Sequence, residues 1–255
     1  MMSTVFATVN QKGGVGKTTT AVNLAAYLAT FGKKILLIDS DPQGNATSGI
    51  GMDKNSISAC MYDVLINGTD INNIIKPTPV SGLDIAPATP RLAGAEVDLI
   101  EVETREARFK NAIKLIRGKY DYFIIDCPPS LSLLTVNALT AADQVIIPIQ
   151  CEYFALEGLS QLVKTIDLVR KSLNPDLRLC GILLTMYDSR TLLSEQVADE
   201  TRKHFGGKVF KTVIPRNVRL AEAPSFGQPI IFYDPSSTGA VAYENLSREV
   251  LDGHI

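Results

Sequence analysis

A short segment rich in glycine and lysine near the start of the chain constrains its fold more than any other feature. Residues 10–20 read NQKGGVGKTTT, directly after the apolar run Val5–Val9 and directly before a helical pattern that contains Ala21, Leu24 and Leu28. Glycines let backbone N–H groups curl around anionic oxygens, and a helix N-terminus adds unpaired donors and a favourable dipole. A strand, a glycine loop and a helix in this order therefore predict a phosphate-binding P-loop.

Individual residues of this loop have distinct expected roles. We expect the Lys17 ammonium to reach the β- and γ-phosphates of a nucleotide and the Thr18 hydroxyl to ligate Mg²⁺. The loop departs from the standard GxxxxGK[ST] pattern, because Gln11 stands where the first glycine is required and a second lysine, Lys12, follows it. The other residues of the loop that we expect to contact the nucleotide are Gly13, Gly14, Val15, Gly16 and Thr19.

Short apolar runs rich in valine and isoleucine recur along the chain, and helical patterns lie between them. The clearest helical pattern spans Leu156–Leu173 and ends at Asn174-Pro175. Most of the runs are nearly continuous, as expected of strands that are covered on both faces. This alternation predicts right-handed βαβ crossovers and an α/β fold with a doubly wound, mostly parallel sheet flanked by helices. The expected strands are Val5–Val9, Ile35–Ile38, Leu83–Ala86, Tyr122–Ile125, Val145–Ile149, Ile182–Leu184, Val209–Ile214 and Ile230–Phe232.

Length and composition predict one folded unit over residues 1–255. The chain is long enough to bury a large core, it is 45% hydrophobic, and neither a linker nor a repeat divides it. The cysteines lie far apart without a CxxC pair, so we expect buried thiols rather than zinc ligands or disulfides. The sequence shows neither a secretory leader nor an apolar run of membrane-spanning length, which favours a cytoplasmic protein.

Acidic residues follow two of the expected strands at the edge where ligands bind in parallel sheets. Asp39 and Asp41 end the run Ile35–Ile38, and their spacing puts both on the same side of an extended segment. Asp126 ends the run Tyr122–Ile125, as the carboxylate of a Walker B element does. We expect the first two to serve Mg²⁺ and the attacking water, and Asp126 to hold Mg²⁺ through a water molecule.

The KGGxGKT loop resembles the deviant Walker A motif of the ParA/MinD group of P-loop ATPases. Residues 6–45, 126–142, 150–162, 183–190 and 213–224 also look like the ParA/Soj chromosome- and plasmid-partition ATPases. The resemblance implies an ATP hydrolase that uses ATP and Mg²⁺, in which Lys12 reaches the nucleotide of a partner subunit and closes an ATP-dependent sandwich dimer. It further implies that Asp39 assists Mg²⁺ through water and that Asp41 positions the nucleophilic water.

The same resemblance assigns residues to the adenine ring. It implies that Pro215 and Asn217 lie against the ring, with Met186 as a weaker candidate. A side-chain amide such as that of Asn217 can read the donor and acceptor edge of adenine, which favours ATP over GTP. Cys151 and Phe154 lie in a segment for which we expect only core packing, and His204 and His254 are expected at the surface.

Basic residues are concentrated between Tyr187 and Arg219, where seven Lys/Arg stand against four Asp/Glu in a chain of net charge −2. Such a region can bind a phosphate backbone, although an ordinary solvated helix face has the same composition. The resemblance implies that Arg190 and Arg219 bind double-stranded DNA without reading its sequence. Arg216 and Lys203 are further candidates.

The family also implies a role and a partner. These are chromosome or plasmid partitioning on the nucleoid, and a ParB/Spo0J-like protein that stimulates hydrolysis. Longer members carry an N-terminal helix-turn-helix domain; the first strand here begins within five residues of the start, so we expect no such extension.

Alternative functions share the phosphate loop. A MinD-like ATPase that positions a membrane or protein cargo would be expected to end in a basic amphipathic helix, whereas residues 244–255 read ENLSREVLDGHI and carry acidic groups. A reductase resembling the nitrogenase iron protein would need cysteines that bridge a cluster, which Cys127 and Cys151 do not match. A metabolic enzyme of the dethiobiotin synthetase type would not explain Arg190, Arg219 and the DxDPQGN segment at residues 39–45 together.

Overall fold

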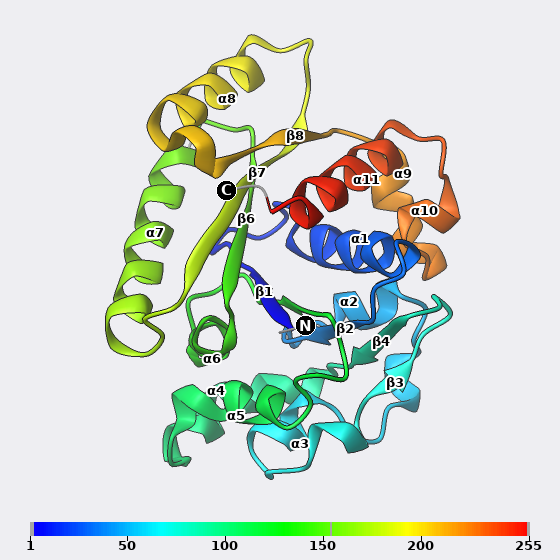
Figure 1. Cartoon of the computed structure of the whole chain (residues 1–255), viewed down its shortest axis with the longest axis vertical. Coiled ribbons are helices and arrows are strands. Elements are labelled where there is room, and N and C mark those ends of the chain that lie inside the picture. Colours follow the sequence, from blue (N-terminus) through cyan, green and yellow to red (C-terminus); the bar gives the residue numbers. More distant parts are fainter. Residues whose placement is uncertain (1–2, 154, 254–255) are drawn as a thin grey trace.

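An eight-stranded sheet forms the centre of the computed structural model, which describes residues 3–153 and 155–253 (Figure 1). The strands lie in the order β3-β4-β2-β5-β1-β6-β7-β8. Neighbouring strands are parallel except for β3 and β4, which pair antiparallel at one edge. The strands are β1 Thr4–Thr8, β2 Ile35–Asp39, β3 Lys76–Pro77, β4 Leu83–Ala86, β5 Tyr122–Asp126, β6 Gln144–Gln150, β7 Arg178–Tyr187 and β8 Val209–Pro215.

Helices connect the strands and cover both faces of the sheet (Figure 1). The α-helices are α1 Lys17–Thr30, α2 Asn45–Gly49, α3 Met61–Leu65, α4 Ala95–Asp98, α5 Arg108–Lys114, α6 Leu133–Ala141, α7 Ala155–Ser172, α8 Leu192–Phe205, α9 Val218–Glu222, α10 Ile230–Tyr233 and α11 Thr238–Leu251. Short 3₁₀ turns occur at Lys54–Ser56, Ile71–Asn73, Pro90–Gly94, Leu99–Glu101, Arg105–Ala107, Gly206–Lys208 and Ala223–Phe226.

The sheet separates two hydrophobic cores because successive side chains of a strand point to opposite faces. Val5 and Ala7 of β1 pack in one core together with residues of α3, α5, α6 and α7. Phe6 of the same strand packs in the other core, against α1 and α11. Burial on both faces explains why the runs in the sequence are continuous rather than alternating. The doubly wound α/β fold predicted from the sequence is therefore confirmed.

One expected strand is wrong, and one observed strand was not predicted. The run Ile230–Phe232 forms part of the helical turn α10, which begins after Pro229 and buries only Ile230. Its first amide donates to the Asn23 side chain at 2.7 Å, so the run is anchored to α1 and not to the sheet. A run this short cannot be told from a buried helical turn by periodicity. The two-residue edge strand β3 was missed because it is short and contains Pro77.

The structure also bears on the predictions for the longest helix, the cysteines and the histidines. Helix α7 spans Ala155–Ser172, which matches the expected Leu156–Leu173 within a residue at each end. The cysteines at positions 60, 127, 151 and 180 are free and buried, as expected. His204 is exposed, whereas Phe154 and His254 lie outside the described residues. Within residues 3–153 and 155–253, no helix combines the length and the apolar character needed to cross a membrane.

Candidate nucleotide-binding site

The glycine loop connects the central strand β1 to helix α1. Gly14 and Gly16 have φ angles of 73° and 90°, a left-handed conformation that residues with a Cβ adopt at a cost. Gly16 is the N-cap of α1, and no side chain caps this helix end. The first amide groups of α1 are therefore available for an anion, and the helix dipole favours one there.

Lys17 is buried at the first turn of α1 and lies above the loop. Its ammonium group donates a hydrogen bond to the carbonyl oxygen of Lys12 at 3.0 Å, which closes the loop on itself. Burial lowers the pKa of Lys17, and the negative charge of Asp126 partly opposes this shift. A desolvated ammonium that is held by a carbonyl has unused donors, which a phosphate oxygen can accept.

The register of the sheet brings the predicted carboxylates together. Asp126 at the end of β5 pairs with Thr8 of β1 on one side and with Asp39 of β2 on the other. Asp39 and Asp126 have no exposed surface, and Asp41 is 6% exposed. Burial, reinforced by the nearby charge of Asp39, raises the pKa of Asp126 well above its usual range.

Asp39 is fixed by residues of the segment that follows it. One carboxylate oxygen accepts hydrogen bonds from the Thr47 amide and hydroxyl, at 2.8 and 2.7 Å, and the other accepts from the Asp41 amide at 3.1 Å. Burial raises the pKa of Asp39 to about 6, even though the bonds from Thr47 oppose the shift. The Thr47 hydroxyl also accepts from the Ala88 amide, so β2 and the loop after β4 are tied through one side chain.

The charges and hydrogen bonds of this cluster fit a cation. Oδ2 of Asp126 is buried and finds no hydrogen-bond partner within the described residues, although Thr18 and Lys17 are close enough to lower its pKa. Buried polar atoms without partners are rare and indicate an ion or water. In the described ranges, no group of three or more His, Cys, Asp or Glu side chains forms a cage for a metal ion. This arrangement suits Mg²⁺, which is commonly held by few protein ligands together with phosphates and water.

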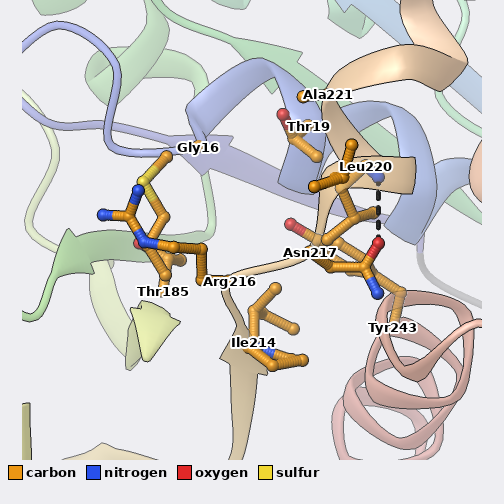
Figure 2. A pocket seen from close by; sticks show the side chains of 12 residues that line it. Gly16, Thr19, Thr185, Ile214, Arg216, Asn217, Leu220, Ala221 and Tyr243 are labelled. Atoms are coloured by element: carbon orange, nitrogen blue, oxygen red, sulfur yellow. Dashed lines mark hydrogen bonds between the residues drawn. The ribbon is translucent and has the colours of Figure 1, made fainter. Parts of the chain in front are cut away.

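Two cavities meet at the loop. A cleft of about 280 Å³ is lined by the loop and the carboxylate segments, namely Gly13, Gly14, Gly16, Lys17, Thr18, Thr19, Asp41, Gln43, Asn45, Pro129 and Met186. A mainly apolar cavity of about 360 Å³ lies beyond the end of β8 (Figure 2) and is lined by Gly16, Thr19, Thr185, Met186, Ile214, Pro215, Arg216, Asn217, Val218, Leu220, Ala221 and Tyr243. Gly16, Thr19 and Met186 line both cavities, so a polar cleft for phosphates adjoins an apolar one of a size that suits a base.

Asn217 lines the apolar cavity, but its amide is already engaged. Its Oδ1 accepts from the amides of Arg219 and Leu220 at 2.8 and 3.3 Å and so caps α9; Figure 2 shows the second bond as a dashed line. Its Nδ2 donates to the Thr238 hydroxyl at 2.8 Å. One Nδ2 hydrogen is left. In this conformation Asn217 can therefore donate one hydrogen bond to a base but has little capacity to accept one from it.

Thr185, near the end of β7, joins the loop to the sheet, and Met186 follows it. The Thr185 hydroxyl lies 2.8 Å from the Val15 carbonyl and 3.0 Å from the Ile149 carbonyl. Met186 has a φ of 50°, which is uncommon for a residue with a side chain and often marks a functional position. Thr185 was not among the residues predicted from the sequence, although a hydroxyl within an apolar strand is the kind of signal that could have identified it.

Lys12 points away from the phosphate cleft. With Val15 it lines a separate small cavity of about 50 Å³ against α7, and its ammonium forms an ion pair with Glu152. Gln11, which replaces the first glycine of the standard motif, donates to the Gly158 carbonyl at 3.3 Å. The unusual half of the loop is thus held by Glu152, which lies between β6 and α7, and by the first turn of α7, which sequence spacing did not reveal.

The arginines predicted to bind DNA lie outside both cavities. Tyr187 and Pro215 pair at the ends of β7 and β8, and Arg190 and Arg219 follow them. Both side chains are exposed, by 84% and 54%. The structure therefore divides the predicted residues into a nucleotide group at the ends of β1, β2, β5, β7 and β8, which lines the two cavities, and the exposed arginines Arg190 and Arg219 outside them.

The phosphate loop, the buried carboxylates and the parallel sheet define a P-loop nucleotide-binding protein. The family model described as "AAA domain" matches residues 3–179. The chain is 59% identical to the sporulation initiation inhibitor protein Soj of Bacillus subtilis, over 98% of both chains. It is 56% identical to the chromosome partitioning protein ParA of Myxococcus xanthus, over 95% of this chain and 86% of that one. The chain belongs to the ParA/Soj family of chromosome-partitioning ATPases.

Solved structures with the same fold contain nucleotides. Cobyrinic acid a,c-diamide synthase from Mycobacterium smegmatis, with bound ADP and magnesium, is 38% identical with a TM-score of 0.86, over 98% of this chain and 94% of that one. The septum site-determining protein MinD from Pyrococcus horikoshii, complexed with Mg-ADP, is 27% identical with a TM-score of 0.78, over 98% of this chain and 96% of that one. A plasmid partition protein from Borrelia burgdorferi has the same fold and is 26% identical with a TM-score of 0.78, over 99% of both chains.

Proposed function

We propose that this chain is an ATP-driven switch that partitions chromosomes or plasmids, acting as a single P-loop domain on the nucleoid in the cytoplasm. ATP binding and pairing of two subunits would create the form that binds DNA, and hydrolysis would release it. The observation that carries this proposal is the identity to Soj along nearly the whole chain, which includes the basic segments after β7 and β8 as well as the phosphate loop.

The phosphate cleft supports the assignment of ATP. We assign the phosphates to Lys17, the N-terminal amides of α1 and the loop residues from Gly13 to Thr19. The base would occupy the apolar cavity, against Pro215 and Met186. Asn217 would then act mainly by capping α9 and shaping the cavity, since its Oδ1 already accepts two hydrogen bonds.

The carboxylates support hydrolysis. Mg²⁺, when bound, would neutralise phosphate charge, with the Thr18 hydroxyl as its ligand and Asp39 and Asp126 holding its water molecules. The orphaned Oδ2 of Asp126 is the observation that fits this role. Asp41 lines the phosphate cleft and is only partly used by the Gln43 amide, at 2.9 Å, so it can orient an attacking water.

Lys12 supports a role in pairing two subunits. Its side chain is half exposed and directed toward Glu152 rather than toward its own phosphate cleft. A cation that cannot serve its own nucleotide in this conformation is suited to serve that of a partner, as an arginine finger does. Dimerisation would then require Lys12 to leave Glu152.

Arg190 and Arg219 support DNA binding without sequence reading. Their guanidinium groups are exposed and follow neighbouring strands, so each can contact a backbone phosphate. Arg216 is a further candidate of the same segment, whereas Lys203 is paired with Glu200 on α8. A ParB-like protein that binds centromere-like DNA would be the partner that stimulates hydrolysis.

The first test is binding to a random-sequence DNA duplex with ATP, with ADP and without nucleotide, each at two salt concentrations. Wild type would be compared with Arg219→Ala and with Arg170→Ala, a control arginine on α7 that also forms an exposed ion pair one helical turn away. We expect binding that requires ATP, weakens with salt and is lost in Arg219→Ala but not in the control.

Two other results would redirect the assignment. If ATP drives dimerisation but no state binds DNA, the ATPase assignment stands and partitioning on DNA fails. A MinD-like role with a membrane or protein cargo would then be the leading alternative. If Arg170→Ala weakens binding as much as Arg219→Ala does, the basic segment after β8 is not the DNA contact.

A further inference from the structure

Each of the two arginines assigned to DNA is held by carboxylates of its own chain. Nη2 of Arg190 lies 2.7 Å from Oδ2 of Asp188, and its Nε donates to Oδ1 of Asp188 at 2.8 Å. The backbone amide of Arg190 donates to the same Oδ1 at 3.1 Å. The guanidinium and the carboxylate thus meet as two forks, the strongest geometry for such a pair.

Arg219 has a more extended set of partners. Its Nη1 donates to Oε2 of Glu222 at 2.9 Å, and its Nε lies 3.4 Å from Oδ2 of Asp234. The Tyr233 hydroxyl donates to the same Oε2 of Glu222 at 3.0 Å, and the Tyr233 ring stacks on Phe226 with centroids 5.0 Å apart. Glu222 is therefore held in place from two directions.

The pKa values of the acids agree with this geometry. Hydrogen bonds from Arg190, with a further contribution from the charge of Arg216, hold the pKa of Asp188 well below its usual range. Bonds from Arg219 and Tyr233 lower the pKa of Glu222. Both acids are consequently anionic wherever DNA binding would be measured.

Each of these carboxylates lies only two or three residues from its arginine in the sequence. Asp188 and Arg190 belong to one loop after β7, and Arg219 and Glu222 to one turn of α9. A carboxylate only two or three residues away moves with its arginine when two subunits pair. The counterion therefore accompanies the arginine into any complex and is removed only by local competition.

Resting on the proposed function, we propose that Asp188 and Glu222 are intramolecular counterions that a DNA phosphate must displace, and that they keep the DNA affinity of a single subunit low. Phosphate and carboxylate are both anions that seek the same planar donors, so each contact exchanges one anion for another. Such an exchange adds little to the affinity for DNA for each arginine. Binding then depends on the combined contacts of two linked subunits, where effective concentration multiplies weak affinities.

The experiment uses the full chain with Glu222→Gln, Asp188→Asn and, as control, Asp167→Asn. Asp167 pairs with Arg170 on α7 at 2.9 Å, so the control also removes one exposed counterion and changes the net charge equally. Binding to a random-sequence duplex would be titrated with ATP and with ADP across several salt concentrations, and thermal unfolding would check each fold.

We expect Glu222→Gln and Asp188→Asn each to bind DNA about three- to fivefold more tightly than wild type and the control, and the double variant about tenfold. The dependence of binding on salt should become steeper, by up to about one unit of slope for each arginine whose charge is released. The gain should appear with ATP as well as with ADP, because each counterion accompanies its arginine in the dimer as it does in the single subunit.

Affinities equal to that of Asp167→Asn would overturn the proposal, since net charge alone would then explain the change. Weaker binding than wild type would also overturn it, because the carboxylates would then be positioning the arginines rather than competing for them. A wild type that binds no DNA in any nucleotide state would refute the proposed function and the inference with it. That result is distinguishable from the other two.

Discussion

Acidifying the ligand-free protein from about pH 8 to about pH 5 should raise its free energy of unfolding, contrary to the usual effect of acid. The reason is the buried carboxylate Asp39, whose pKa burial raises from 3.8 to about 6. Above the folded-state pKa, Asp39 is charged in both states and the folded state carries the full cost of a buried charge. As the pH falls through that value, the folded state takes up a proton that the unfolded state does not, so folding becomes more favourable.

The size of the effect follows from the shift. Each pKa unit corresponds to about 1.4 kcal/mol, so a change from 3.8 to about 6 corresponds to about 3 kcal/mol in full, of which about half is gained by about pH 5 and the rest by about pH 4. Asp126 shifts in the same direction and adds to the gain. Acids with lowered pKa values, such as Asp63, act oppositely, but their stabilisation is lost only below their unfolded pKa of about 4.

The assay is urea unfolding in EDTA without nucleotide, repeated at intervals between about pH 8 and about pH 5. Asp39→Asn cannot titrate at this position and is the matched variant. Its stability should depend less on pH, because it lacks the proton uptake of Asp39 and has no charge there to raise the pKa of Asp126. Stability that is constant or falls between about pH 8 and about pH 5 would refute the reasoning, because it would mean that these carboxylates are not desolvated in the folded protein.

Three further changes have expected outcomes. Thr185→Val removes the single hydroxyl hydrogen that the carbonyl oxygens of Val15 and Ile149 share, and should lower the free energy of unfolding by about 2 kcal/mol in urea unfolding; a neutral result would show that the hydroxyl is not needed there. Glu152→Gln should let Lys12 leave its ion pair more easily, so that the ATP-dependent dimer forms at about two- to fivefold lower protein concentration in analytical ultracentrifugation, and a higher threshold would count against this role. Gly227→Ala should destabilise the fold by at least ~1 kcal/mol, because φ is 63° and the new Cβ would lie 2.7 Å from Cα of Gly51; an unchanged melting temperature would contradict this.

The parts of the fold that follow a strong local pattern were predictable. The central strands are buried on both faces, and their runs of valine and isoleucine are long enough to be recognised without knowledge of their neighbours. The run Ile230–Phe232 was assigned wrongly, because only the contact of its first amide with Asn23 and the turn after Pro229 decide its conformation. The conformation of this run therefore depends on its contact with helix α1 and not on the run itself.

The sequence by itself determined the phosphate loop and the positions of Asp39 and Asp126 at strand ends, because loop chemistry and strand ends are set by residues close together in the chain. Only the tertiary structure decided that these two carboxylates are in register and share a buried space with one lysine. It also decided that Lys12 pairs with Glu152, 140 positions further along the chain. Electrostatic and hydrogen-bond energies depend on distance and burial, and neither can be read from spacing along a chain.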